Sequence, residues 1–187
     1  MDEKPYQLLD ETREPIPMKE KHCKRVDNEY IWCGTCSIFI FTEPLTGWRH
    51  VYAREHRTKV DWAYEIKELL TVYYPNTKKI RLIMDNLNTH KISSLYEAFE
   101  PAQARELAKR LKIHYTPKHG SWLNIAEIEL SALGQQRLDR RIANIKHLNH
   151  SLSSWEIQRN EKQKGVDWQF TTSYARVKLK RLYPVIE

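Results

Sequence analysis

A short apolar run that ends abruptly at a carboxylate constrains this chain more than any other feature. The run spans Ile80 to Met84, and Asp85 and a polar loop follow it. It is too continuous for a half-exposed strand and too short for a helix, so it predicts a strand covered on both faces. Ligands bind at the carboxyl ends of strands in open α/β sheets, because the loops diverge there. Asp85 is therefore a candidate site residue, and the alternative is an Asx turn made with Asn86.

The segments around this run predict a mixed α/β fold. Residues 30–42 and 48–54 are rich in β-branched and aromatic residues and predict two strands joined as a hairpin. Thr58 can cap a helix whose apolar spacing continues until Pro75. The elements expected after the run are a helix capped by Ser93 or Ser94, its continuation from Pro101, a strand over 113–116 and a helix over 123–138. This order predicts a mixed sheet with helices on its faces.

Length and charge limit the class of protein. A chain of 187 residues with 41% hydrophobic content can bury one ordinary core, so we expect a single domain. Lys and Arg number 31 and Asp and Glu 24, which gives a net charge of +7 and favours a polyanionic partner, most simply nucleic acid. No apolar run approaches the roughly 18 residues that span a bilayer, and the first residues do not form a signal peptide. We therefore expect a soluble, intracellular protein without a membrane partner.

The three cysteines do not predict a metal site. Cys33 and Cys36 form one Cys-x-x-Cys pair, but a finger-like zinc site needs a second pair, and Cys23 is the only other cysteine. The pair also lies in a predicted strand, where an odd separation sends the two side chains to opposite faces. We expect buried or half-buried thiols.

The predicted helix over 123–138 carries a second candidate carboxylate. Its apolar face consists of Leu123, Ala126, Leu130 and Leu133. Glu127 borders this face, so we expect its side chain to point toward the sheet. Glu129 lies about 200° away around the helix and is expected in solvent. The alternative is an amphipathic helix on which both glutamates are solvated.

Three motifs, in order, resemble one known family. They are Met-Asp-Glu-Lys-Pro-Tyr-Gln-Leu-Leu at 1–9, Met-Asp-Asn-Leu-Asn-Thr-His at 84–90 and Tyr-Thr-Pro-Lys-His-Gly-Ser-Trp-Leu-Asn-Ile-Ala-Glu-Ile-Glu-Leu-Ser at 115–131. The chain resembles the catalytic domain of bacterial insertion-sequence transposases related to the mariner elements, which belong to the DDE endonuclease superfamily. The resemblance extends from the first residue at least to Arg141. It implies a ribonuclease-H-like mixed sheet flanked by helices over 1–141.

The resemblance also implies a metal site. It places the family's acidic triad on Asp2, Asp85 and Glu127, where it would bind divalent metal, as two Mg²⁺ ions with Mn²⁺ as a substitute. Further motif positions near this site, expected to position phosphate or water, are Asn86, His90, His119 and Asn124. For the two histidines the alternative is that they are ordinary loop residues. Two ions about 4 Å apart can stabilise the attacking and leaving oxygens of phosphoryl transfer together, so no nucleophilic side chain is needed.

The segment 142–187 is expected to be a helical, basic extension of the same domain. Thr171 or Thr172 can cap a last helix. The cations expected to bind DNA are Lys118, Arg176, Lys178, Lys180 and Arg181. Cations on such a surface would contact phosphates without reading the base sequence. The alternative is a helix packed on the domain with a solvated charged face.

The resemblance implies metal-dependent DNA cleavage and strand transfer at insertion-sequence ends, by a homo-oligomer on double-stranded DNA in the bacterial cytoplasm and nucleoid. The alternative is a non-catalytic DNA-binding remnant or a truncated partner subunit of a decayed element. Compared with the family, the sequence begins late in the first strand and without a helix-turn-helix region. We therefore expect a fragment, a second reading frame or a remnant, with an upstream helix-turn-helix polypeptide as a partner. Pro5 is expected to limit how far the first strand continues beyond Asp2.

Overall fold

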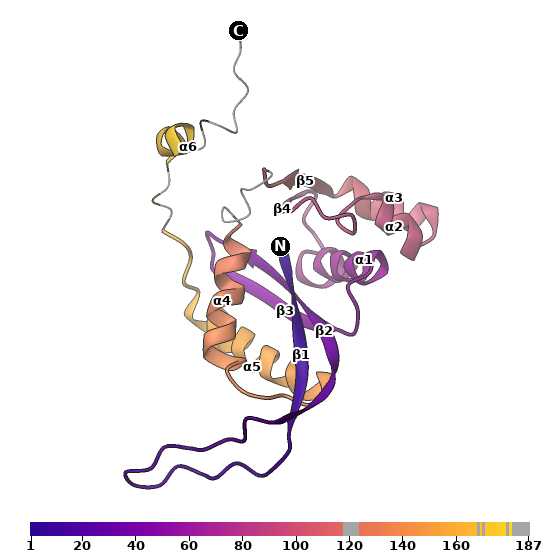
Figure 1. Ribbon diagram of the computed structural model, residues 1–187. Helices are drawn as coiled ribbons and strands as arrows, with labels where there is room; N and C mark the ends of the chain where they lie inside the picture. Colours follow the sequence, from indigo (N-terminus) through magenta and orange to yellow (C-terminus); the bar gives the residue numbers. More distant parts are fainter. Residues whose placement is uncertain (118–123, 168, 170, 179, 181–187) are drawn as a thin grey trace.

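The strands form two sheets in the computed structural model, which describes residues 1–117, 124–167, 169, 171–178 and 180. The first sheet is antiparallel with the order β1-β2-β3, and the second is a parallel pair of β4 and β5 (Figure 1). The strands are β1 (Asp2–Glu11), β2 (Tyr30–Glu43), β3 (Trp48–Arg54), β4 (Ile80–Met84) and β5 (Leu111–Tyr115). The mixed α/β class expected from the sequence is confirmed, but the described strands form an antiparallel and a parallel sheet in place of the single mixed sheet expected.

Helices connect and flank these sheets. They are α1 (Lys59–Glu68), which continues into a π-helical turn (Leu69–Tyr73), then α2 (Ser93–Ala98), α3 (Pro101–Lys109), α4 (Ile125–Arg137), α5 (Ile145–Lys162) and α6 (Thr172–Lys178). Thr58 caps α1 through a capping box with Asp61, as predicted. The prediction that Ser93 or Ser94 caps α2 is wrong, because both lie inside the helix and the Ser94 hydroxyl donates instead to the carbonyl oxygen of Thr89 (2.8 Å).

Strand β2 is buried on both faces and connects two hydrophobic clusters. Successive side chains of a strand point to opposite faces. Phe39 therefore belongs to a cluster with α1, α2, α3 and the β4–β5 sheet, whereas Ile40 belongs to a cluster with α4 and α5. Figure 1 shows α1 on one side of the three-stranded sheet and α4 and α5 on the other. The sheet is thus the middle layer of the molecule.

Strand β4 differs from its prediction. We expected cover on both faces, but Leu82 and Met84 are buried while Arg81 and Ile83 are exposed. The reason is that the helices pack on one face only, where Leu82 and Met84 join the cluster of α1, α2 and α3. Alternation along β4 therefore leaves its other face open.

Strand β1 is longer than Pro5 led us to expect. It pairs with β2 over ten residues and continues to Glu11, so the predicted limit beyond Asp2 is wrong. Proline is tolerated here because β1 is an edge strand of its sheet. After β1, a long arm over 12–29 returns to β2 through two isolated bridges, Ile16 with Arg25 and Lys19 with His22.

The two halves of the carboxyl-terminal segment differ. Helix α5 packs against β3, and its Leu148, Leu152 and Trp155 are fully or almost fully buried, so it is part of the core. Helix α6 has no buried side chain among its described residues. The Thr171 hydroxyl accepts a hydrogen bond from the backbone N–H of Tyr174, which confirms the predicted cap. No helix in the described ranges is long and apolar enough to cross a membrane.

Only one cysteine has the buried or half-buried environment expected. Cys36 is buried, but the expectation is wrong for Cys33 and Cys23, which are exposed. Within the described residues, no cysteine belongs to a cluster that could hold a metal ion.

The double-sided burial of β2 yields a first prediction. Replacing fully buried Ile40 with alanine should lower the free energy of unfolding by about 2–5 kcal/mol, because the cavity adds to the lost burial. Ile157→Ala is the matched control, since Ile157 is 56% exposed, and it should change stability by less than about 1 kcal/mol. Urea unfolding followed by circular dichroism measures both. Equal losses would mean that β2 is not packed on both faces.

Candidate functional site

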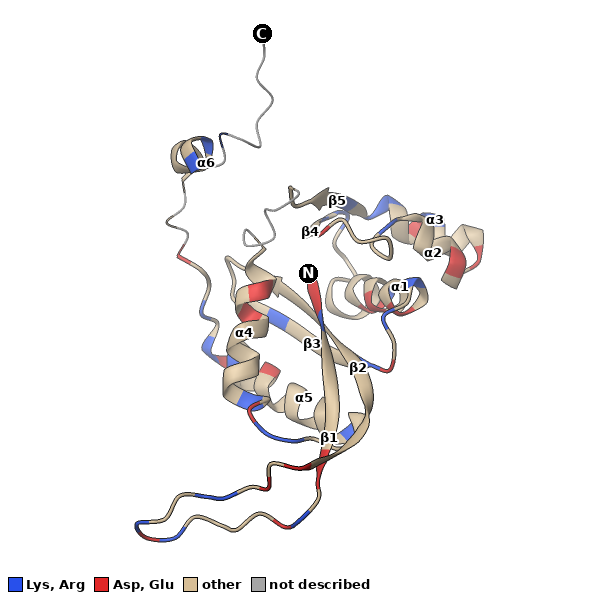
Figure 2. Ribbon diagram, in the orientation of Figure 1, with Lys and Arg blue, Asp and Glu red and all other residues tan. Residues whose placement is uncertain are grey.

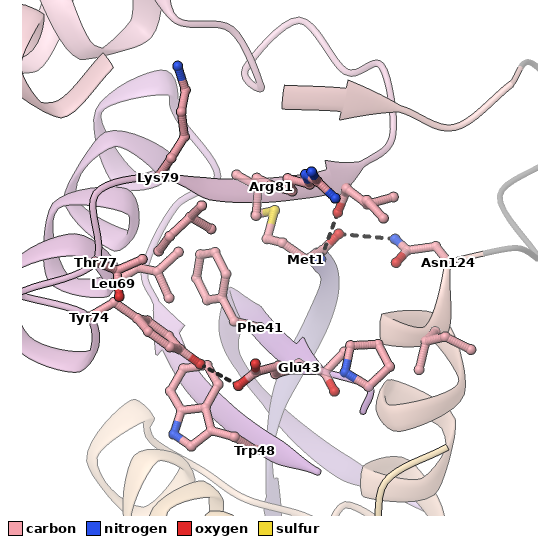
Figure 3. A pocket seen from close by; sticks show the side chains of 16 residues that line it. Met1, Phe41, Glu43, Trp48, Leu69, Tyr74, Thr77, Lys79, Arg81 and Asn124 are labelled. Atoms are coloured by element: carbon pink, nitrogen blue, oxygen red, sulfur yellow. Dashed lines mark hydrogen bonds between the residues drawn. The ribbon is translucent and has the colours of Figure 1, made fainter. Parts of the chain in front are cut away.

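Three elements meet at one edge of β4. The backbone nitrogen of Met1, at the start of β1, donates to the carbonyl oxygen of Ile83 in β4 (2.9 Å). Asn124 is the N-cap of α4, and its side-chain amide donates to the carbonyl oxygen of Met1 (3.0 Å) and to Asp2 Oδ2 (3.3 Å). Figure 3 shows Met1 between β4 and Asn124. The start of β1, the end of β4 and the first turn of α4 are therefore held together.

These elements carry the three predicted acidic residues. Asp2 is the first residue of β1, Asp85 directly follows β4, and Glu127 lies in the first turn of α4. Figure 2 shows acidic residues at the start of β1 and in the first turns of α4. Glu127 is half-buried, as expected for a residue that borders the apolar face. A cavity of about 510 Å³ is lined by Met1, Ile83 and Asn124 among others, but none of the three acidic residues lines it.

The electrostatics of this site favour a cation. Burial raises the pKa of Asp2 from its ordinary value of 3.8 to about 6, and the charges of Glu3 and Asp85 act in the same direction. A hydrogen bond from the backbone N–H of Glu3 to Asp2 Oδ1 (2.8 Å) opposes this shift without cancelling it. The crowded negative charge can be relieved by protons or by a metal ion. Carboxylate oxygens are the donors that Mg²⁺ prefers, so the residues present fit this ion.

Asp85 is held by a buried chain of charged groups. His90 Nδ1 lies 2.6 Å from Asp85 Oδ1, and His90 Nε2 lies 2.8 Å from Glu3 Oε2. Burial alone would lower the pKa of His90, but the hydrogen bond that the imidazole donates to Glu3 and the charges of Glu3 and Asp85 outweigh it and raise that pKa. The Asp85 carboxylate is thus engaged with His90 and not in the alternative Asx turn.

His90 and Asn124 are buried, and their expected roles in positioning phosphate or water stay predictions. The His90 side chain is fully buried and lies against Asp85. Asn124 is also buried and orients Asp2. Asn86 is exposed beside Asp85, and its predicted role stays a prediction.

Glu3 is a site residue that the sequence analysis missed. Among the described residues, the metal-capable atoms at this site that lie within 4.8 Å of one another belong to Glu3, Asp85 and His90, and not to the predicted triad. Alternation along β1 suggested that Glu3 faces away from Asp2. Its position next to Asp2 in the first motif was the feature of the sequence that could have identified Glu3 as a site residue.

The expectation that Glu129 is solvated is wrong. Glu129 is only 4% exposed, and its two oxygens lie 2.6 and 2.8 Å from Nε and Nη2 of Arg49 on β3. Arg159 on α5 adds contacts of 3.0 and 3.1 Å. Burial acts to raise the pKa of Glu129, but the two guanidinium groups outweigh it and hold the pKa below its ordinary value. Helix α4 is covered on two sides, by the sheet and by α5, which its apolar spacing alone did not reveal.

The predicted DNA-contacting cations are only partly described. Lys118, His119 and Arg181 lie outside the described residues. Arg176, Lys178 and Lys180 are exposed. This exposure agrees with both of the alternatives given for them above.

Comparison with known families agrees with this arrangement. The sequence model of the DDE superfamily endonucleases matches residues 1–149. The chain belongs to this family. The match includes β1, β4 and α4, so all three acidic positions lie inside the DDE region. No curated protein and no solved structure matches the chain.

The contact between His90 and Asp85 yields a prediction for this DDE chain. His90→Gln should weaken Mn²⁺ binding by about 10- to 100-fold, because residues that orient a ligand typically have effects of that size. Isothermal titration calorimetry measures the affinity. His114→Gln is the matched control, since His114 is exposed on β5, and it should bind Mn²⁺ like the parent. Unchanged affinity in folded His90→Gln would show that His90 does not position Asp85.

The buried pair of Glu129 and Arg49 yields a prediction about stability. Glu129→Gln should lower the free energy of unfolding by about 3–5 kcal/mol, because it leaves a buried guanidinium without its counter-charge. The folded-state pKa of Glu129 is depressed, so its contribution is complete above its ordinary pKa of 4.5 and is lost as the pH falls through the folded-state pKa. Thermal unfolding from pH 7 to pH 3 measures both effects.

The neighbouring glutamate supplies the control for that measurement. Glu127→Gln removes a half-buried carboxylate from the same helix and should change stability by less than about 1 kcal/mol. If the two variants unfold alike at pH 7, the ion pair contributes nothing to stability.

Proposed function

We propose that this DDE endonuclease is the catalytic domain of a DNA transposase, with a ribonuclease-H-like arrangement of its sheet. In this proposal Asp2, Asp85 and Glu127 bind divalent metal and the protein cuts DNA strands at insertion-sequence ends and joins them to target DNA. The meeting of β1, β4 and α4 at one edge of β4 is the observation that carries the proposal. The raised pKa of Asp2 supports it, because it reflects carboxylates gathered in a partly buried place.

The chain's own residues prepare this site. Mg²⁺, or Mn²⁺ in its place, would supply charge stabilisation to the attacking and leaving oxygens at phosphorus, most effectively as two ions. His90 holds Asp85 in one orientation, and Asn124 does the same for Asp2 while capping α4. The amino-terminal end of α4, with its positive partial charge, lies on the side of the carboxylates and favours an anionic substrate there. Rigid ligands of this kind lower the entropy cost of binding metal.

Double-stranded DNA is the proposed substrate and partner. The net charge of +7 and the exposed Arg176, Lys178 and Lys180 fit contacts with phosphates, which contribute affinity without sequence specificity. In this proposal, an upstream helix-turn-helix polypeptide recognises the ends of the element. A homo-oligomer of the chain cuts the two ends. The proposed location is the bacterial cytoplasm, on the nucleoid when DNA is bound.

Nicking of DNA that carries the element's ends tests this proposal. Mg²⁺-dependent nicking should fall by about 100-fold or more in Asp85→Asn and in Glu127→Gln, because each removes charge stabilisation from the transition state. Glu161→Gln is the control, since Glu161 is exposed near the end of α5. If the parent chain binds this DNA but does not nick it, even with an upstream polypeptide added, the non-catalytic alternative holds. If the parent nicks and both variants nick equally well, the triad assignment is wrong.

A further inference from the structure

A second cluster of metal-capable side chains lies between β3 and α1 and shares no residue with the candidate active site. His50 comes from β3, and Glu65 and Glu68 come from α1. One ligand atom from each lies within 4.8 Å of the others. His50 is 5% exposed and Glu65 is completely buried, so this is not a solvated surface cluster.

Two atoms of this cluster are buried without a hydrogen-bond partner in the described structure. They are His50 Nε2 and Glu65 Oε2, which lie 3.9 Å apart. That separation is too long for a hydrogen bond. Two ligand atoms that each lie about 2.0–2.1 Å from one tetrahedral Zn²⁺ ion are about 3.4 Å apart, so an ion would draw these two atoms together by about 0.5 Å. The spacing therefore suits a shared ion better than a direct contact.

The remaining polar atoms of the two side chains already have partners. Glu65 Oε1 accepts from Arg54 Nε (2.5 Å), so only Oε2 is available. His50 Nδ1 lies 3.1 Å from Glu156 Oε2 on α5 and 2.9 Å from the hydroxyl oxygen of Tyr73. Glu156 Oε2 also accepts from the backbone N–H of Val51 (2.9 Å), which fixes its position.

This arrangement is typical of a histidine that binds metal. Such a histidine donates its second ring N–H to a carboxylate, which fixes the tautomer and turns the other nitrogen toward the ion. With its proton on Nδ1 and donated to Glu156, His50 directs the Nε2 lone pair toward Glu65 and Glu68. Tyr73, the other partner of Nδ1, belongs to the π-helical turn that follows α1, and such turns frequently occur at functional sites.

We propose that His50, Glu65 and Glu68 bind one zinc-type divalent ion, which joins β3 to α1. One imidazole nitrogen with two carboxylates is a donor set that suits Zn²⁺, whereas Mg²⁺ prefers oxygen ligands alone. The ion stabilises the fold and does not touch the DNA substrate. The proposal is therefore independent of the transposase assignment.

Zinc titration of the full chain tests the site. The parent for this test carries Asp85→Asn and Glu127→Gln, so that the candidate active site has lost two carboxylates. We expect this parent to retain one Zn²⁺ per chain in equilibrium dialysis and to gain thermal stability with Zn²⁺. Co²⁺ in place of Zn²⁺ should give the visible absorption of an ion with a nitrogen ligand.

Single substitutions in this parent test which side chains bind the ion. Glu68→Gln should weaken Zn²⁺ binding by at least about tenfold and remove the thermal shift, and Glu68 is half-buried, so its replacement is compatible with folding. Glu161→Gln is the matched control and should bind like the parent. His50→Gln should abolish the Co²⁺ absorption. Unchanged Zn²⁺ binding in Glu68→Gln overturns the proposal, and so does a folded parent that binds no Zn²⁺, in which case His50 is a protonated partner of Glu65 and Glu156.

Discussion

Burial of β2 on both faces is the constraint on which the rest of the structure depends. Phe39 and Phe41 of this strand pack against the layer that contains α1 and β4. Ile38 and Ile40 pack against the layer that contains α4 and α5. Strand β1 is attached to β2 in a register that places Asp2 opposite Ile40. A shift of this register by one residue would exchange the faces of β1 and turn Asp2 away from Asn124. The hydrophobic core thereby determines where the first acidic residue lies.

Buried charged groups then set the positions of the helices. Glu129 joins α4 to β3 through Arg49 and to α5 through Arg159. Burying these charged groups costs desolvation free energy, so the network stabilises the fold only if every member has a partner. Its benefit is orientation, since the rotation of α4 that buries Glu129 also brings Asn124 to Asp2. A structural ion pair in the middle of the helix and a candidate metal ligand in its first turn are thus coupled through one rigid element.

The two histidine-centred clusters of the protein use the same physical device. In each, a buried imidazole lies between carboxylates from different segments: His90 between Glu3 and Asp85, and His50 among Glu65, Glu68 and Glu156. In the first cluster both ring nitrogens of His90 have close carboxylate partners, so the ring orients Asp85. In the second, the Glu65 oxygen that faces Nε2 of His50 is 3.9 Å away, which leaves room for an ion between them. The distance from Nε2 to its carboxylate, 2.8 Å for His90 and 3.9 Å for His50, separates a positioning histidine from a candidate ligand.

The sequence by itself determined the features that depend on near neighbours in the chain. These include the strand that ends at Asp85, the hairpin of β2 and β3, the Thr58 cap and the start of α3 at Pro101. The three motifs also carried enough information to predict the family, which the match over residues 1–149 confirms. Only the tertiary structure decided the open face of β4, the burial of His90 and the burial of Glu129. The physical reason is that a charged side chain is buried only where a partner is supplied, and the partner of Glu129 lies 80 residues away in the chain, on another element, beyond the reach of helical periodicity.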